Sequence, residues 1–173
     1  MTKGPTVHAS AVRVGDRAVL IRGPSGAGKS RLAFDLILAG RAGQLPPSVL
    51  VGDDRVHLDT VAGQLWVRPA RELGGLMEVR GLGIRRCAFV GEAVVGLVVD
   101  LAASDAERLP PPESLSIVLN GVKLPRIPVG IGYAPLPLIA ASLTTTVGSE
   151  STQPLDDCLK GIGNHIGPNI ATE

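Results

Sequence analysis

The apolar residues of this chain fall mostly in short runs separated by glycine, proline, asparagine and aspartate, a pattern typical of β-strands. Two pairs of runs are joined by turn sequences and predict hairpins, one around residues 59–62 and the other across Asn120-Gly121. The pattern predicts strands at 8–14, 17–22, 49–51, 56–58, 63–67, 93–101, 116–119 and 122–124. A β-rich core follows.

Helical spacing of apolar residues occurs in two places. Residues 31–40 follow a glycine-rich turn, and Gly40 is a suitable helix end. Residues 136–143 predict a second helix. From about Thr144 the sequence is rich in Ser, Thr, Gly and Asn with little periodicity, so we predict one domain at 1–145 and a flexible tail at 146–173.

The turn between the strand 17–22 and the first helix has the pattern G-x-x-x-x-G-K-S, a Walker A phosphate loop. Its glycines let backbone N–H groups point inward, and the helix N-terminus adds partial positive charge. Lys29 can reach the β- and γ-phosphates of a nucleotide, and the Ser30 hydroxyl can bind Mg²⁺. The expected nucleotide-binding residues are Gly23, Ser25, Gly26, Ala27, Gly28, Lys29 and Ser30.

The order of elements narrows the fold class. The loop and its helix are followed by hairpins rather than by regular strand–helix repeats, which disfavours a doubly wound nucleotide kinase. We predict an α/β fold in which a β-rich core carries the phosphate loop and flanking helices. Since apolar residues make up 45% of the chain but aromatic residues only 2%, Val, Leu, Ile and Ala must build this core.

Charge and targeting signals limit the possible partners. The net charge of +1 gives no electrostatic reason to expect nucleic acid or a membrane surface. The first ten residues contain no apolar run like that of a signal peptide, so we expect a cytoplasmic protein. The two cysteines lack the spacing of a metal site.

Two adjacent carboxylates follow the predicted strand 49–51. Ligands in open sheets collect at the carboxyl ends of strands, so Asp53 and Asp54 are candidates for a metal contact and for a general base. A solvated Asp-Asp turn is the alternative for the pair taken alone. The phosphate loop upstream favours the catalytic interpretation, and we assign the base to Asp53.

Three further polar residues are candidate site residues. His8 precedes the loop by one strand pair and can donate a hydrogen bond to phosphate or orient an aspartate. Glu78 and Arg80 are two residues apart, so in a strand they would face the same side. Glu78 is a candidate Mg²⁺ ligand and Arg80 a candidate phosphate contact; a surface ion pair beside a turn is the alternative.

These residues, in this order, resemble the catalytic domain of the HPr kinase/phosphorylase family over about residues 6–130. The specific part is the signature Glu-Val-Arg-Gly-Leu-Gly-Ile at 78–84 after the Asp-Asp pair. The resemblance implies a core related to phosphoenolpyruvate carboxykinase, ATP and Mg²⁺ as cofactors, and homo-hexamers. It also implies phosphorylation of a serine in HPr, a phosphocarrier of the phosphotransferase system, and reversal by inorganic phosphate with release of pyrophosphate.

Two departures from the family pattern are visible. The chain begins shortly before His8, so we expect the short form without the usual N-terminal domain, which resembles proteins of alphaproteobacteria whose carrier is regulatory. The family pattern Pro-Val-x-x-Gly-Arg is replaced at 128–133 by a sequence ending in Tyr133, and neither Lys123 nor Arg126 matches the missing arginine. We expect the missing arginine to reduce phosphorolysis more than kinase activity. The alternatives are a small-molecule kinase and a nucleotide-binding regulator with reduced catalysis.

Overall fold

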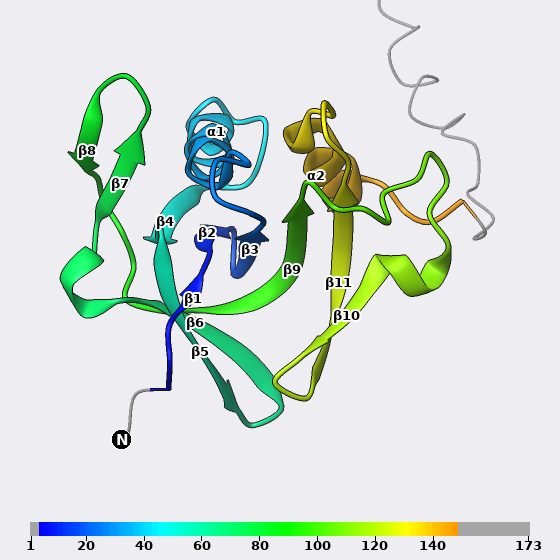
Figure 1. The fold of residues 1–173 in the computed structure, drawn as a ribbon, viewed down its shortest axis with the longest axis horizontal. Helices are drawn as coiled ribbons and strands as arrows, with labels where there is room; N and C mark the ends of the chain where they lie inside the picture. Colours follow the sequence, from blue (N-terminus) through cyan, green and yellow to red (C-terminus); the bar gives the residue numbers. More distant parts are fainter. Residues whose placement is uncertain (1–3, 149–173) are drawn as a thin grey trace, which may run out of the picture. The chain divides into compact units, whose positions relative to one another are not determined.

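The computed structural model describes residues 4–148 (Figure 1). The helices are α1 (Lys29–Arg41) and α2 (Pro135–Thr144), with 3₁₀ turns η1 (Arg71–Leu73) and η2 (Pro112–Leu115). The strands are β1 (Val7–His8), β2 (Ser10–Val14), β3 (Arg17–Arg22), β4 (Ser48–Gly52), β5 (Arg55–Val61), β6 (Gln64–Pro69), β7 (Leu76–Val79), β8 (Gly83–Arg86), β9 (Ala93–Leu101), β10 (Ser116–Leu119) and β11 (Val122–Val129).

Among the described residues, nine of the strands form one large mixed sheet. Its main path runs β1-β5-β6-β9-β3-β2-β4, and β11 joins β9 in parallel while carrying β10. Strand β2 is antiparallel to both β3 and β4, and β9 is parallel to β3. Strands β3, β4, β9 and β11 therefore all point the same way, and their carboxyl ends meet at one edge of the sheet.

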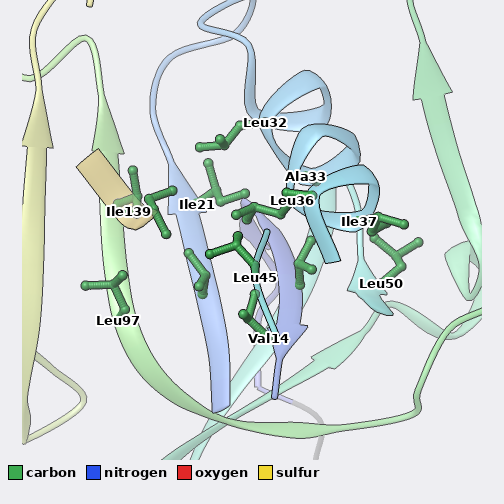
Figure 2. Packing of buried hydrophobic residues seen from close by; sticks show 14 of the residues in the cluster. Val14, Ile21, Leu32, Ala33, Leu36, Ile37, Leu45, Leu50, Leu97 and Ile139 are labelled. Carbon is green, nitrogen blue, oxygen red and sulfur yellow. The ribbon is translucent and has the colours of Figure 1, made fainter. Parts of the chain in front are cut away.

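The central strands are buried on both faces. On β3, Val19 and Ile21 join a cluster with α1, whereas Ala18 and Leu20 join a second cluster on the opposite face. Figure 2 shows the first cluster, in which Leu32 and Leu36 of α1 pack over the sheet. This double burial explains why these strands are continuous apolar runs.

A β-bulge in β9 exchanges the faces of its side chains. Ala18 pairs with Val95, but Val19 pairs with Leu97, so Gly96 is an extra residue. As a result Val95 belongs to one apolar cluster and Leu97 to the other, although they are two residues apart. A Cβ on Gly96 would lie 2.8 Å from the Cβ of Arg17, so the bulge requires glycine.

A second, two-stranded sheet is formed by β7 and β8 (Figure 1). The turn between them spans residues 80–82, and the Leu82 N–H donates to the Val79 carbonyl at 2.9 Å. The prediction that Glu78 and Arg80 share one face of a strand is therefore wrong. The alternating pattern continues through Arg80, but the positive φ angles of Gly81 and Gly83, 92° and 84°, produce a turn instead.

Most predicted elements are present with longer bounds. The expected strands 17–22 and 93–101 match β3 and β9, and both predicted helices exist. The first hairpin turns at Ala62-Gly63 rather than across residues 59–62, because β5 continues to Val61. Within the described residues no helix is long and apolar enough to cross a membrane. The predicted flexible tail, 146–173, lies outside the described residues from position 149 onward.

Candidate active site

The sheet edge where the parallel strands end carries the candidate site. Strand β3 leads into the glycine-rich loop at Gly23, and β4 leads into Asp53. Strands β9 and β11 end at Leu101 and Val129. Because all four strands run in one direction, residues distant in sequence converge here, as expected for ligand sites in open sheets.

The loop at residues 23–30 is shaped by glycines with positive φ, 148° at Gly23, 80° at Gly26 and 98° at Gly28. A Cβ on Gly23 would lie 2.9 Å from the Leu101 carbonyl oxygen, so the loop can pack against β9 only with glycine there. Helix α1 begins after Gly28 without a side-chain cap. Its first backbone N–H groups are thus available for an anion.

The side chain of Lys29 reaches back to the start of this loop. Its side chain is largely buried, with the residue 6% exposed. The ammonium Nζ donates to the carbonyl oxygens of Gly23 and Pro24 at 2.9 and 3.0 Å. An ammonium has three N–H donors, so these two hydrogen bonds leave one donor for a ligand.

Asp53 is the centre of a buried hydrogen-bond network. The residue is 2% exposed, and its Oδ1 accepts hydrogen bonds from the hydroxyls of Ser10 and Ser30, at 2.5 and 2.9 Å. Its Oδ2 accepts the backbone N–H of Glu78 at 3.2 Å. One carboxylate thus joins β2, α1 and β7 at the end of β4.

Asp54, the neighbouring residue, has a different environment. Its side chain is 61% exposed, and its Oδ1 lies 3.1 Å from Nε2 of His8, which is 43% exposed. The register of β1 with β5 places His8 opposite Arg55 and hence beside Asp54. A φ of 65° turns the backbone at Asp54, so the two adjacent carboxylates have separate surroundings.

Glu78 and Arg80 are less closely tied to this network. Glu78 is connected to Asp53 through its backbone, while the residue itself is exposed on β7. Arg80 is exposed in the turn that follows.

The thiol of Cys87 interacts electrostatically with Asp53 and Arg41. Burial raises the pKa of this thiol, and the charge of Arg41 offsets the increase only in part. Cys87 is therefore a neutral thiol at pH 7.

An ion-pair cluster behind the loop was missed by the sequence analysis. Asp100 accepts two hydrogen bonds from Arg22, at 2.7 and 2.8 Å, and one from Arg126 at 2.5 Å. Arg126 also donates to Asp105 and to the Ser114 carbonyl. The position of Arg22 directly before the loop was a signal, but its partner is 78 residues away.

The charges of this cluster shift its pKa values. Burial alone would raise the pKa of Asp100, but the hydrogen bonds and charges of Arg22 and Arg126 outweigh it and lower the pKa. The hydrogen bond from Arg126 also lowers the pKa of Asp105. Arg126 is thus held by two carboxylates.

Ser10 is a second site residue that sequence reasoning missed. It is fully buried at the start of β2, and it contacts Asp53 across 43 residues of sequence. A lone serine in a buried strand was the available signal, although serine is common there without a role. The pairing of β2 with β4 creates the contact, and no local pattern encodes that pairing.

The fold and site together define a mixed α/β protein with a glycine-rich loop facing a buried aspartate. The model of the HPr Serine kinase C-terminal domain family matches residues 1–132, and the chain belongs to this family. An HPr kinase/phosphorylase of Neisseria meningitidis is 31% identical over 173 aligned residues, covering 86% of this chain and 52% of that protein. One of Streptococcus thermophilus is 41% identical over 80 residues, covering 46% of this chain and 24% of that protein.

A solved structure supports the same grouping. The Hpr(Ser) kinase/phosphatase from Coxiella burnetii superimposes with a TM-score of 0.64 at 28% identity, covering 81% of this chain and 93% of that one. The large mixed sheet is therefore shared with a structure of this family. This chain spans about half the length, or less, of the curated relatives that it matches.

Proposed function

We propose that this protein is an ATP-dependent serine kinase that phosphorylates an HPr-type phosphocarrier and thereby regulates a phosphotransferase system. The observation that carries the proposal is the buried Asp53 hydrogen-bonded to Ser30 of the glycine-rich loop, with the exposed pair His8–Asp54 beside it. A nucleotide site and an accessible carboxylate are the parts that phosphoryl transfer to a hydroxyl needs. The relatives' name, HPr kinase/phosphorylase, supports the choice of acceptor.

The loop at 23–30 would bind the phosphates of ATP. Backbone N–H groups at the start of α1 would donate to phosphate oxygens, and the remaining donor of Lys29 would contact the β- and γ-phosphates. The resemblance adds Arg80 as a further phosphate contact. It also suggests a phosphoenolpyruvate carboxykinase-like core for this arrangement.

The oxygen atoms of Ser30 and Asp53 suit Mg²⁺. The hydroxyl and the carboxylate lie 2.9 Å apart, and Mg²⁺ prefers a few such protein oxygens together with phosphate and water. Among the described residues no group of three His, Cys, Asp or Glu side chains could hold a metal ion. Glu78 would supply another carboxylate. Bound Mg²⁺ would neutralise the developing charge on the phosphates.

The surroundings of the two aspartates support a different base from the one assigned from sequence. Asp53 as general base stays an untested prediction, but its burial and three hydrogen bonds leave little access for a serine of another protein. Asp54 is exposed and paired with His8. We therefore assign the base to Asp54, positioned by His8, and the metal contact to Asp53.

In the forward step, Asp54 would accept the proton of the acceptor serine while the serine oxygen attacks the γ-phosphorus. The bond from that phosphorus to the β–γ bridging oxygen breaks, and ADP leaves with the electron pair. In the reverse step inorganic phosphate would attack phosphoserine, Asp54 would return the proton to the serine oxygen, and pyrophosphate would form. By the resemblance, the active form would be a homo-oligomer.

Mass spectrometry tests this proposal directly. The HPr-type carrier of the same organism is incubated with the protein, Mg²⁺ and ATP, and a gain of one phosphoryl group on a serine is expected. The Lys29→Ala variant should lose the transfer. An unmodified carrier together with tight ATP binding would favour a nucleotide-binding regulator, which the missing arginine at position 133 also favours. Phosphorylation of a small molecule alone would indicate the small-molecule kinase.

A further inference from the structure

A cavity of about 330 Å³ lies next to the glycine-rich loop, and Asp53 is not among the residues that line it. It is lined by Gly26, Ala27 and Gly28 of the loop and by the segment 130–133 that follows β11. Leu101 and Ala102, at the end of β9, also line it. The cavity is therefore continuous with the loop proposed to bind phosphates, and its volume is at the lower end of that of small-molecule sites.

The lining of this cavity is apolar and close to neutral. Leu32, Val129 and Pro135 contribute aliphatic surface. The charged lining residues are Arg31 and Asp35, one turn apart on α1, whose side chains lie 3.9 Å from each other. Since their charges compensate, the cavity offers no excess positive charge for a second anion, and an uncharged planar group suits it better.

Tyr133 supplies an aromatic ring to the cavity. The residue is 71% exposed, although aromatic side chains are usually buried. Its ring lies against Gly130, where an added Cβ would be 3.3 Å from Cδ2, and its N–H donates to the Gly130 carbonyl at 3.2 Å. The turn thus holds the ring at the cavity, where a flat ligand can stack on it.

We propose that this cavity binds the purine base and ribose of the nucleotide, with Tyr133 stacking on the base. This proposal rests on the proposed function, because the phosphates of the same nucleotide must occupy the loop at 23–30. An aromatic ring accepts any base by stacking, and such contacts contribute substantially to nucleotide affinity. Tyr133 would therefore determine the affinity for the nucleoside part and not for the phosphates.

Two ligands separate the base from the phosphates. ATP with Mg²⁺ carries both parts, whereas inorganic tripolyphosphate with Mg²⁺ carries the phosphates alone. By calorimetry, Tyr133→Ala should weaken ATP binding about tenfold and leave tripolyphosphate binding unchanged. Tyr133→Phe should retain the wild-type affinity for ATP. Val118→Ala, which removes an exposed apolar side chain on β10 outside the cavity, is the matched control and should change neither affinity.

The wild-type protein allows a second measurement that does not depend on a folded variant. Tyr133 is the single tyrosine of the chain, so its ring signals in an NMR spectrum need no further assignment. Stacking on a base should move these signals upfield with ATP, and tripolyphosphate should leave them in place. Signals that ATP does not move, or that both ligands move equally, would overturn the nucleoside site.

The Lys29→Ala variant distinguishes failure of this inference from failure of the proposed function. If Lys29→Ala weakens both ligands while Tyr133→Ala weakens neither, the phosphate loop is supported and the nucleoside site is overturned. If Lys29→Ala binds both ligands as tightly as the wild type, the proposed phosphate site itself is wrong, and this inference is overturned with it.

Discussion

At the scale of single residues, Asp53 and Asp54 show how neighbouring side chains of one type can have different properties. Asp53 is buried among three donors, whereas Asp54 is exposed beside His8. If Asp54 is the general base, Asp54→Asn should lower the rate of phosphoryl transfer at least about 100-fold and leave ATP affinity unchanged. Transfer is measured by mass spectrometry of the carrier, and ATP affinity by calorimetry.

The matching variant of the buried aspartate should behave differently. Asp53→Asn is expected to weaken Mg²⁺-dependent ATP binding, because the carboxylate next to Ser30 is lost. Asp16→Asn, an exposed aspartate in the turn before β3, is the control and should change neither quantity. Two results together would show that Asp53 is the general base. Asp54→Asn would transfer the phosphoryl group at the normal rate, and Asp53→Asn would bind ATP but be inactive.

Ser10 gives a prediction about stability. Ser10→Ala removes one of the hydrogen-bond donors to the buried carboxylate of Asp53. The remaining hydrogen bonds then offset less of the free-energy cost of burying this carboxylate. We expect the free energy of unfolding to fall by about 1–3 kcal/mol. Urea unfolding followed by circular dichroism measures this, and an unchanged midpoint would show that Ser30 and the Glu78 N–H suffice for Asp53.

The site residues differed in how far the sequence could predict them. Lys29 and Ser30 belong to a local eight-residue motif, so their positions at the start of α1 followed from the sequence. The contacts of Asp53 with Ser10 and Glu78 depend instead on pairing between distant strands. Local patterns contain no information about that pairing, so both contacts could be found only in the structure.

At the scale of elements, the bulge in β9 explains how one strand serves two apolar clusters. Gly96→Ala would place a Cβ 2.8 Å from the Cβ of Arg17, and this near part of the Arg17 side chain cannot rotate away. We expect a loss of about 1–3 kcal/mol in the free energy of unfolding. Gly91→Ala, with no atom within 4 Å of the added Cβ, is the matched control. Equal stability of the two variants would contradict this account of the bulge.

The elements themselves were predictable where burial and turn signals agreed. β3 matched its predicted bounds because its apolar run lies between a Gly-Asp turn and the glycine-rich loop. β5 extends past its predicted end because its exposed half pairs with β6 and needs no apolar pattern. The turn at Arg80 was missed, because Glu-Val-Arg alternates like a strand and only the following glycines end it.

Strands β3, β9 and β11 are joined by the cluster of Arg22, Asp100 and Arg126, which predicts a pH dependence of stability. Because the folded-state pKa of Asp100 is lowered, the unfolded chain binds more protons at acid pH. This contribution to stability is fully present above the unfolded pKa of about 4 and is lost as the pH falls through the lower folded pKa.

Replacement of Asp100 tests this contribution. Asp100→Asn should lower the free energy of unfolding at pH 7 by about 2 kcal/mol, since it weakens charge-assisted hydrogen bonds to two arginines. The variant should also lose less stability than the wild type between about pH 5 and pH 3. Urea unfolding at several pH values measures both effects. If the free energy of unfolding depends on pH in the same way in the wild type and the variant, Asp100 is not the source of the pH dependence.

At the scale of the whole molecule, the chain belongs to the HPr Serine kinase C-terminal domain family and shares its fold with a solved structure of that family, while the segment after β11 departs from the pattern that the resemblance implies. The resemblance places an arginine where this chain has Tyr133, and Arg126 is held by Asp100 and Asp105. The lining of the adjacent cavity carries one compensated pair, Arg31 and Asp35. The glycine-rich loop can hold the phosphates of a nucleotide. Free inorganic phosphate would need a further cation of the protein, and the arginine that the pattern has at position 133 is not present to supply it.

We therefore expect the forward reaction to exceed phosphorolysis in this protein. Carrier phosphorylated on serine is incubated with the protein, Mg²⁺ and inorganic phosphate, and pyrophosphate release is compared with the forward rate at equal enzyme concentration. Tyr133→Arg should lower the KM for phosphate, because a guanidinium binds phosphate oxygens in bidentate fashion. An efficient reverse reaction in the wild type would mean that another cation, with exposed Arg80 the first to test, already holds the phosphate.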